Sequence, residues 1–598
     1  MWTFWQLLLA VPLLMLGLYC CYIKVVHIKY DHIPGAPRAS FFFGHLPIFW
    51  RMVKNKELIH DLFLKWAEKY GPVIRLNAFH RVSLIILSPE GVKEYLMSSQ
   101  YSKDARIYGR FYNMFGVRFL GNGLATDLDY NHWHKQRRIM DPAFSRNYLI
   151  GLMEIFNDQA EDLMKVLNEK ADGETEVDMM NLLRRLALDI IAKVAFGLEL
   201  NTLHCDKTPF PHAVSMVMKG VSKERNPFFQ YLPRNRKEVQ EIRESVRLLR
   251  CTGKECITQR LKAIQNEEPV PLDILTQILK SADQEESDDE NMIDNFLTFF
   301  VAGHDTTANQ LSFTIMELAR HPEIVTKLQA EVDEVIGVKR DIVYEDLRKL
   351  EYLSQVHKEI LRLYPPIPGT MRWTEKKNVI EGIDIPANTT LFFSTYIMGR
   401  MERYFKDALT FDPDRFSKGK SRPYFSYFPF SLGPRSCIGQ LFAQVSGGSV
   451  HAGAETGVWR GWTARPGAGG GGGVDRVERG AGQEGGKEAG AMAPASAAAE
   501  AADHDAEAPW HGAAQSRVGG HAGRGGGVAL RMMKLQAAAP RQLRLGWCMG
   551  RCHACAVLPG RGGCWATARV HPRPAWHTLQ PQERRRSART RERKRKSE

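Results

Sequence analysis

The chain has 598 residues and a formal net charge of +14, values that would favour several domains and a nucleic-acid or anionic-membrane partner. The charge is unevenly placed, because residues 445–598 carry 24 Lys and Arg against 12 Asp and Glu, whereas residues 1–444 carry 57 against 55. The basicity is therefore no evidence that residues 1–444 bind nucleic acid, and no nucleic-acid partner is expected for them. Six cysteines scattered over that part exclude a disulfide-rich secreted domain and indicate a reducing compartment.

The first segment, MWTFWQLLLAVPLLMLGLYCCYIK, is apolar almost throughout from Trp2 to Ile23. A helix of this length rises about 33 Å, which is enough to cross a hydrocarbon core. The segment lacks the basic leader and small-residue cleavage site of a signal peptide, and Lys24 and Lys29 follow it. Positive charge on that side places the rest of the chain in the cytoplasm. We expect residues 1–26 to form a membrane anchor, with a buried core helix as the alternative.

The hydrophobic pattern from about Glu57 to Gln444 is mostly helical, with a few short strand-like runs. The runs VIRLNAF and VSLIIL have the alternation of strands, and DQEESDDE (283–290) is expected to be a solvated loop. The pattern predicts one large, mainly α domain with a small β-sheet over residues 27–444. Its long amphipathic stretches are 151–170, 179–197, 235–265, 291–320 and 322–336.

Residues 445–598 have a different composition, holding 28 of the 50 glycines of the chain. Runs such as GAGGGGG, APASAAAEAA and RRRSARTRERKRK have too few large apolar residues to offset the entropy of ordering. We predict a disordered Gly/Ala/Arg-rich tail. Its terminal basic run keeps a second function class open, in which the tail binds a polyanion or acts as a nuclear signal.

A single cysteine stands among glycines in the string FSLGPRSCIGQ, with the spacing Phe430-x-x-Gly433-x-Arg435-x-Cys437-x-Gly439. The flanking glycines let the backbone approach a flat, bulky group. A helix that begins at the cysteine would aim free N–H groups at its sulfur and favour the thiolate, which is a strong donor to haem iron. The alternative reading of Cys-x-Gly alone is a buried free cysteine in a turn.

A second pattern, FFVAGHDTTANQ, places Ala302-Gly303 in the middle of a predicted helix, where glycine costs about 1 kcal/mol relative to alanine. Helices accept this cost where something must lie against the backbone. Asp305 and Thr306 follow, and a carboxylate next to a hydroxyl can relay protons in an apolar cavity. From these residues alone, a helix kink with a solvated aspartate is an equal alternative.

The Cys437 string resembles the haem-binding loop of the cytochrome P-450 monooxygenases, which implies haem b with Cys437 as its axial thiolate. Similarly, AGHDT resembles the helix over the distal face of the haem in that family. The resemblance implies that Thr306 is the oxygen-activating threonine and Asp305 its acidic neighbour. It covers roughly residues 27–444, and the motifs stand in the family's order.

Two further motifs match the family. Glu359-x-x-Arg362, followed by PDRF with Arg415, resembles the buried structural triad behind the haem. The resemblance also implies contacts with the haem propionates. The expected residues are Trp133 and Arg137 in WHKQR, Arg435 in the cysteine loop, and Arg372 in TMRW.

Strings such as GHLPIFW, HWHKQRRIMDPAFSR and FSTYIMGRM resemble the sterol side-chain hydroxylases of this family. The activity implied is insertion of one oxygen atom into a sterol side chain. Since residues 1–444 show no credible nicotinamide or flavin site, electrons are expected from a separate NADPH–cytochrome P-450 reductase. The expected location is the endoplasmic reticulum membrane, with a single membrane-spanning helix in contact with lipid and a cytoplasmic catalytic domain.

The family pattern breaks after GQLFAQ. Only residues 438–444 are expected to be helical there, about 10 Å, before the Ser-Gly-Gly run at 446–448 ends the helix. The family's longer helix and the hairpin that lines its substrate pocket have no counterpart in the sequence that follows. Two alternatives therefore stay open: a catalytically impaired, membrane-tethered variant that binds haem poorly, and a haem-thiolate isomerase or dehydratase. The Asp305–Thr306 pair argues against an isomerase or dehydratase, which has no use for a proton relay to dioxygen.

Overall fold

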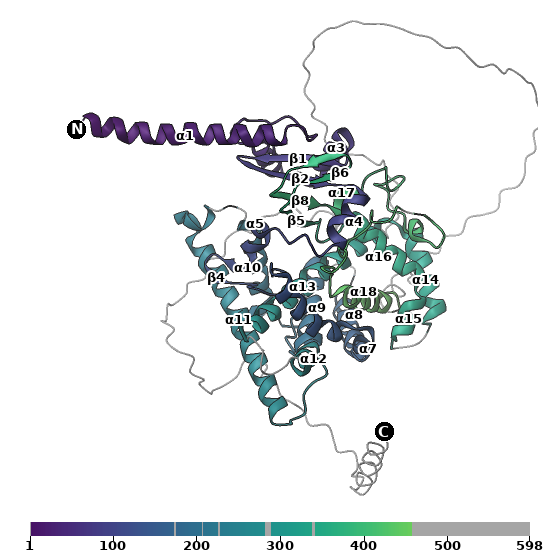
Figure 1. The fold of residues 1–598 in the computed structure, drawn as a ribbon. Coiled ribbons are helices and arrows are strands. Elements are labelled where there is room, and N and C mark those ends of the chain that lie inside the picture. The colour runs from purple at the N-terminus through teal and green to yellow at the C-terminus, as the bar shows by residue number, and fades with distance from the viewer. Residues whose placement is uncertain are drawn as a thin grey trace, which may run out of the picture.

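The computed structural model describes residues 2–456, apart from 173–174, 206, 225, 227, 282–288, 338–340 and 422. The tail from residue 457 onward and most of the acidic loop 283–290 lie outside the described residues. Within them, the chain is mostly helical with small sheets, and the largest sheet lies at the end of the body next to the N-terminal helix (Figure 1). The predicted mainly α fold with a small β-sheet is confirmed for this part of the chain.

The N-terminal helix α1 (Trp2–Tyr30) projects away from the body (Figure 1). Among the described residues, it is the one helix long and apolar enough to span a membrane, with a mean hydropathy of 1.8 and 11% of its apolar window buried. A core helix would be mostly buried, so this exposure favours the anchor over the core-helix alternative. The part of α1 from Tyr19 onward docks on the body: the Tyr19 hydroxyl lies 2.9 Å from His80 Nδ1, Ile23 is buried, and the Tyr30 hydroxyl lies 2.7 Å from Thr389 Oγ1.

The main sheet has the order β1-β2-β8-β5, in which β2 and β8 are parallel and the other pairs antiparallel. Its strands are β1 (Val73–Ala78), β2 (Arg81–Ile86), β5 (Thr370–Thr374) and β8 (Thr389–Phe393). The two predicted strand runs are β1 and β2, joined as a hairpin. Two short hairpins are made of β3 (Asn113–Met114) with β4 (Val117–Arg118) and β6 (Asn378–Ile380) with β7 (Ile383–Ile385).

The helical part of the body is built around α13 (Asp289–Arg320), which packs along α9 (Met179–Phe196) and against α11 (Arg236–Gln265). Their buried aliphatic and aromatic side chains form the largest apolar core. The predicted long helices are all present, the others being α8 (Met153–Glu169) and α14 (Pro322–Val335).

The remaining helices connect these elements or cover the sheet. They are α2 (Leu46–Lys54), α3 (Ile59–Tyr70), α4 (Pro89–Met97), α5 (Ala105–Tyr108), α6 (Tyr130–Met140), α7 (Arg146–Ile150), α10 (Pro209–Lys223), α12 (Ile274–Ser281), α15 (Tyr344–Lys349), α16 (Glu351–Leu363), α17 (Thr395–Met398) and α18 (Gln440–Thr456). A short 3₁₀ turn, η6 (Pro413–Phe416), packs against α16.

The predicted triad forms a buried network between α16 and η6. Nε and Nη2 along one edge of the Arg362 guanidinium each donate to the Glu359 carboxylate at 2.6 Å, and Arg415 Nε lies 3.3 Å from the same carboxylate. Arg362 also donates to backbone carbonyls of the segment that follows α17. A planar guanidinium can bind several acceptors at once, so this network fixes the irregular segment that follows α17.

Helix α18 departs from the prediction made for the residues after Cys437. It begins at Gln440 and runs for 17 residues, straight through the Ser-Gly-Gly run at 446–448. The expectation that the helix ends there is wrong. The helix persists because it is packed against α8, α13 and α14, and tertiary burial outweighs the poor helix propensity of glycine.

The buried face of α18 combines apolar and very small residues. Val445, Val450 and Ala452 are buried in the apolar cores. At Gly453, an added Cβ atom would lie 3.3 Å from the Cβ atom of Ala160 on α8, so the two helices approach closely. The glycines that weaken an isolated helix therefore permit this one to pack.

We expect a chain that stops after Thr456 to keep the thermal unfolding midpoint of the full chain. A chain that stops after Gln444 should unfold at a markedly lower temperature or fail to fold. It loses the burial of Val445 and Val450, worth about 3–6 kcal/mol together. Thermal melts of both proteins in one detergent would measure this, and equal midpoints would contradict the packing role of α18.

Candidate functional site

The loop that carries Cys437 is held in a tight turn against α4. The Cys437 N–H donates to the Phe430 carbonyl at 2.9 Å, and Gly433 has φ = +69°, a conformation that favours glycine. A Cβ atom at Gly433 would lie 2.2 Å from the Leu96 carbonyl oxygen at the end of α4. This glycine is therefore required by the close approach of two backbones.

Cys437 is exposed to solvent, although many protein atoms surround its thiol. This crowding raises its pKa, and two groups oppose the rise, the N–H of Gly439 that donates to the sulfur and the nearby Arg137 guanidinium. The expected N–H donor at the start of a helix is thus present, one residue before α18 begins. The donor and the cation favour the thiolate form that binds iron.

Arg137 on α6 lies against the same loop. Its Nη1 donates to the Ser436 carbonyl at 2.7 Å, and its Nε donates to Asp141 at 2.6 Å. The guanidinium thus ties α6 to the residue that precedes Cys437. Its contacts in this structure are with the loop, whereas the sequence predicts a contact with a haem propionate.

Arg435 and Trp133, which were both predicted to contact a haem propionate, lie next to each other. The Arg435 guanidinium stands 4.0 Å from the centre of the Trp133 ring, and Trp133 is 2% exposed. Arg435 Nη1 donates to the Asp127 carbonyl at 2.8 Å. Burial lowers the pKa of Arg435 to about 10, with Asp127 opposing the shift.

Two further cations lie near Arg435. Arg372, predicted from the sequence, is almost fully buried at the second residue after the start of β5 and donates to Thr370 Oγ1 at 3.0 Å. Lys103, which the sequence analysis missed, donates to the Ala125 carbonyl. Burial lowers the pKa of Lys103 well below its ordinary value, and the positive charges of Arg435 and Arg372 lower it further.

This group, which we call the cation cluster (Lys103, Arg372 and Arg435), carries more positive charge than its surroundings balance. Asp127 attracts Lys103 and Arg435, but it also binds His132 at 2.7 Å and Gln136 at 2.8 Å. Buried like charges are costly unless anions pair with them. The carboxylates of haem would supply such anions, so the residues present fit this cofactor.

Helix α13 brings the second predicted motif into the interior. A Cβ atom at Gly303 would lie 2.6 Å from Ile191 Cδ1, so α9 is what lies against the helix at this glycine. The neighbouring Ala302 is exposed in the middle of an otherwise buried helix. That face of α13 therefore borders open space.

Asp305 and Thr306 are consecutive on α13, but different partners hold them. The Asp305 carboxylate lies 3.5 Å from Arg184 Nη2 on α9, whereas the Thr306 hydroxyl donates to the Ala302 carbonyl at 2.7 Å. His304, which lies between Gly303 and Asp305 in the sequence, is buried, and burial lowers its pKa to about 4. The hydroxyl and the carboxylate therefore point to separate neighbours in this structure.

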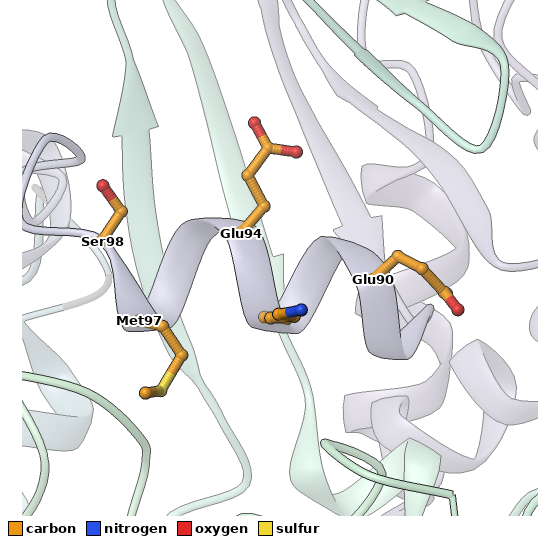
Figure 2. A pocket seen from close by; sticks show the side chains of 5 residues that line it. Glu90, Glu94, Met97 and Ser98 are labelled. Carbon is orange, nitrogen blue, oxygen red and sulfur yellow. The ribbon is translucent and has the colours of Figure 1, made fainter.

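A shallow depression of about 510 Å³ lies on the surface of α4, outside this region. Figure 2 shows that Glu90, Glu94 and Met97 extend from α4 in different directions, so no set of groups converges there. The chemistry-bearing groups gather instead around the Cys437 loop, the cation cluster and α13.

Comparison with known proteins agrees with this arrangement. The family model described as cytochrome P-450 matches residues 34–447. Cytochrome P-450 4d2 of Drosophila melanogaster is 30% identical over 439 residues, covering 69% of this chain and 85% of that protein. Cytochrome P-450 4c21 of Blattella germanica is 30% identical over 435 residues (69% and 84%), and LUTEIN DEFICIENT 5, a chloroplastic protein of Arabidopsis thaliana, is 28% identical over 407 residues (64% and 66%).

Proposed function

Because the chain belongs to the cytochrome P-450 family, whose members are haem-dependent monooxygenases, we propose that it hydroxylates a sterol side chain in the manner of cholesterol 24-hydroxylase. The support for a sterol is the resemblance of strings spread from residue 44 to residue 401, including GHLPIFW and FSTYIMGRM. The observation that carries the catalytic proposal is the Cys437 loop beside a cluster of cations that lacks sufficient anions.

Haem, when bound, would supply the chemistry that activates dioxygen and inserts one of its oxygen atoms into the substrate. Cys437 would hold the haem iron through its thiolate, which the Gly439 N–H favours. Lys103, Arg372 and Arg435 are proposed to bind the haem carboxylates. Trp133 supports Arg435 through its ring, and Arg137 holds the Cys437 loop in position.

Thr306 is proposed to hold a proton at its Oγ1 on the exposed face of α13, with Asp305 supplying protons from the α9 side.

We expect Thr306→Ala to keep its haem while its rate of product formation falls by about 100-fold, the contribution typical of a general acid. Consumption of NADPH should continue without matching product. Product and NADPH are measured in one reaction, with Thr306→Ser as the control that keeps the hydroxyl. If Thr306→Ala forms as much product per NADPH consumed as the unchanged chain, this role is excluded.

The proposed electron donor is NADPH–cytochrome P-450 reductase. The proposed location is the endoplasmic reticulum membrane, with α1 as the single anchor and the catalytic domain in the cytoplasm. Lys24 and Lys29, at the end of α1 that joins the body, support this orientation.

The first test is the difference spectrum of the reduced, carbon-monoxide-bound protein. We expect the strongly red-shifted Soret band of thiolate ligation in the full chain and its loss in Cys437→Ala. If the band is present, reductase, NADPH and cholesterol are then added, and hydroxylated product is measured. A band in Cys437→Ala would exclude Cys437 as the ligand, and turnover without use of NADPH would favour an isomerase or dehydratase.

A second candidate is a membrane-tethered variant that binds haem poorly. The observation that favours it is the end of the family match at residue 447, inside α18. This candidate predicts no thiolate band in the full chain. The band therefore separates the two candidates before any substrate is tried.

A further inference from the structure

A second cavity, of about 440 Å³, lies between α15, α16, α18 and the loop that precedes Cys437. Cavities of 300–1,000 Å³ are typical of small-molecule sites in proteins. We call it the α18 cavity. Its walls are largely apolar, and they include Leu347, Leu353, Phe430, Leu441 and Val445.

Two polar side chains line the α18 cavity although both are more than nine-tenths buried, Gln310 of α13 at 5% exposure and His357 of α16 at 8%. Among the described residues, the side-chain amide of Gln310 hydrogen-bonds to no other group, so it is available to an occupant of the cavity.

The protonation of His357 follows from its neighbour on α18. His451 Nδ1 lies 3.0 Å from the Gly447 carbonyl and 2.9 Å from His357 Nε2. Because a carbonyl can only accept, the proton belongs on His451 Nδ1, and His357 Nε2 is then an acceptor. Burial lowers the pKa of both histidines, so His357 is neutral and carries its proton on Nδ1.

The cavity exists because α18 presents glycine to it. A Cβ atom at Gly448 would lie 3.3 Å from Leu347 Cδ2, and no side chain of α18 occupies that space. A Cβ atom at Gly447 would lie 3.7 Å from His357 Cε1 and 3.9 Å from Gln310 Nε2, so a change there would disturb both polar groups. Gly448 can therefore be changed to reduce the cavity. Gly109, where an added Cβ atom has no other atom within 4 Å, offers a control away from it.

We propose that the α18 cavity binds a neutral amphipathic small molecule with an apolar body and one hydroxyl group. The hydroxyl would accept from His357 Nδ1 and donate to the Gln310 amide oxygen. An ionic head is disfavoured on the cavity floor, because the charged side chains of the lining, Arg348 and Lys358, are exposed or half-exposed. The occupant would contact both α18 and the Phe430 loop, and would stabilise each.

The probe for the test is 2-naphthol, a neutral bicyclic molecule with one hydroxyl, titrated by fluorescence into the full chain in detergent. Naphthalene, which lacks the hydroxyl, is the comparison. We expect saturable binding of 2-naphthol to the unchanged chain and to Gly109→Ala. Naphthalene should bind at least tenfold more weakly, and Gln310→Leu should lower the affinity for 2-naphthol at least tenfold.

Gly448→Leu should lower the affinity for 2-naphthol at least tenfold, because the leucine side chain occupies the part of the cavity next to Leu347 while also favouring the helix. If this variant does not fold, Leu347→Phe reduces the same cavity from α15. The proposal is overturned if Gly448→Leu binds 2-naphthol as tightly as the unchanged chain and Gly109→Ala do, since the probe then binds elsewhere. It is also overturned if naphthalene binds as tightly as 2-naphthol, or if neither binds.

Discussion

Replacing Arg362 by alanine should leave little or no folded protein. The side chains of Arg362 and Glu359 are fully buried and meet through two contacts of 2.6 Å. Arg362 also donates to the carbonyls of Gly399, Ala408 and Thr410. Breaking a buried ion pair by removing one partner costs about 3–5 kcal/mol. That is a large part of the roughly 5–15 kcal/mol by which a folded domain is stable.

Arg247→Ala is the matched control, because Arg247 follows Glu244 at the same spacing but both side chains are exposed on α11. It should change the free energy of unfolding by no more than about 0.5 kcal/mol. Arg362→Lys should resemble Arg362→Ala, since one ammonium cannot replace the planar fork. Thermal melts followed by circular dichroism compare all three, and an Arg362→Ala protein as stable as the control would contradict the network's structural role.

The long helices could be predicted because their apolar residues recur with helical spacing over many turns. The predicted stretch 179–197 is α9 (Met179–Phe196), and 291–320 lies within α13 (Asp289–Arg320). The pairing of β2 with β8 could not be predicted in this way. It joins Leu84 to Leu391 across about three hundred residues, and local periodicity holds no information on such pairing.

The sequence showed where the two motifs place glycine, but it could not show which contacts require glycine there. Gly303 accommodates Ile191 of α9, and Gly433 accommodates the Leu96 carbonyl at the end of α4. Both are approaches between protein elements, whereas the sequence suggested that Gly433 makes room for a flat group and, for Gly303, only that something lies against the helix. A missing Cβ atom shows that something comes close, but only the tertiary structure shows what it is.

The predicted end of the helix after Cys437 was wrong because the prediction used helix propensity alone, whereas tertiary packing determines how far this helix extends. Ser446, Gly447 and Gly448 are poor helix formers in water, yet all three are buried within α18. A similar limit applies to the cation cluster. Trp133 and Arg435 belong to recognisable motifs, whereas Lys103 stands in SKDAR, a string that no local rule distinguishes from an exposed loop.

Lys103→Met should stabilise the haem-free chain and weaken its hold on haem. In the haem-free chain, the Lys103 charge is buried and repelled by Arg435 and Arg372, which lowers its pKa well below the ordinary value. We expect the removal of that charge to relieve more free energy than the lost charged hydrogen bond to Ala125 supplied, about 1.5–3 kcal/mol. The melting temperature of the haem-free variant should therefore rise.

In the haem-bound chain, Lys103→Met removes a proposed charged hydrogen bond to a haem carboxylate. Such a bond is worth about 1.5–3 kcal/mol, so haem affinity should fall by about 10- to 150-fold. Haem transfer to an excess of apomyoglobin measures it, and Lys93→Met on the exposed face of α4 is the control that should change neither quantity. Lys103→Arg should restore haem binding. A fall in both melting temperature and affinity would make Lys103 a structural residue, and unchanged affinity would place it outside the haem site.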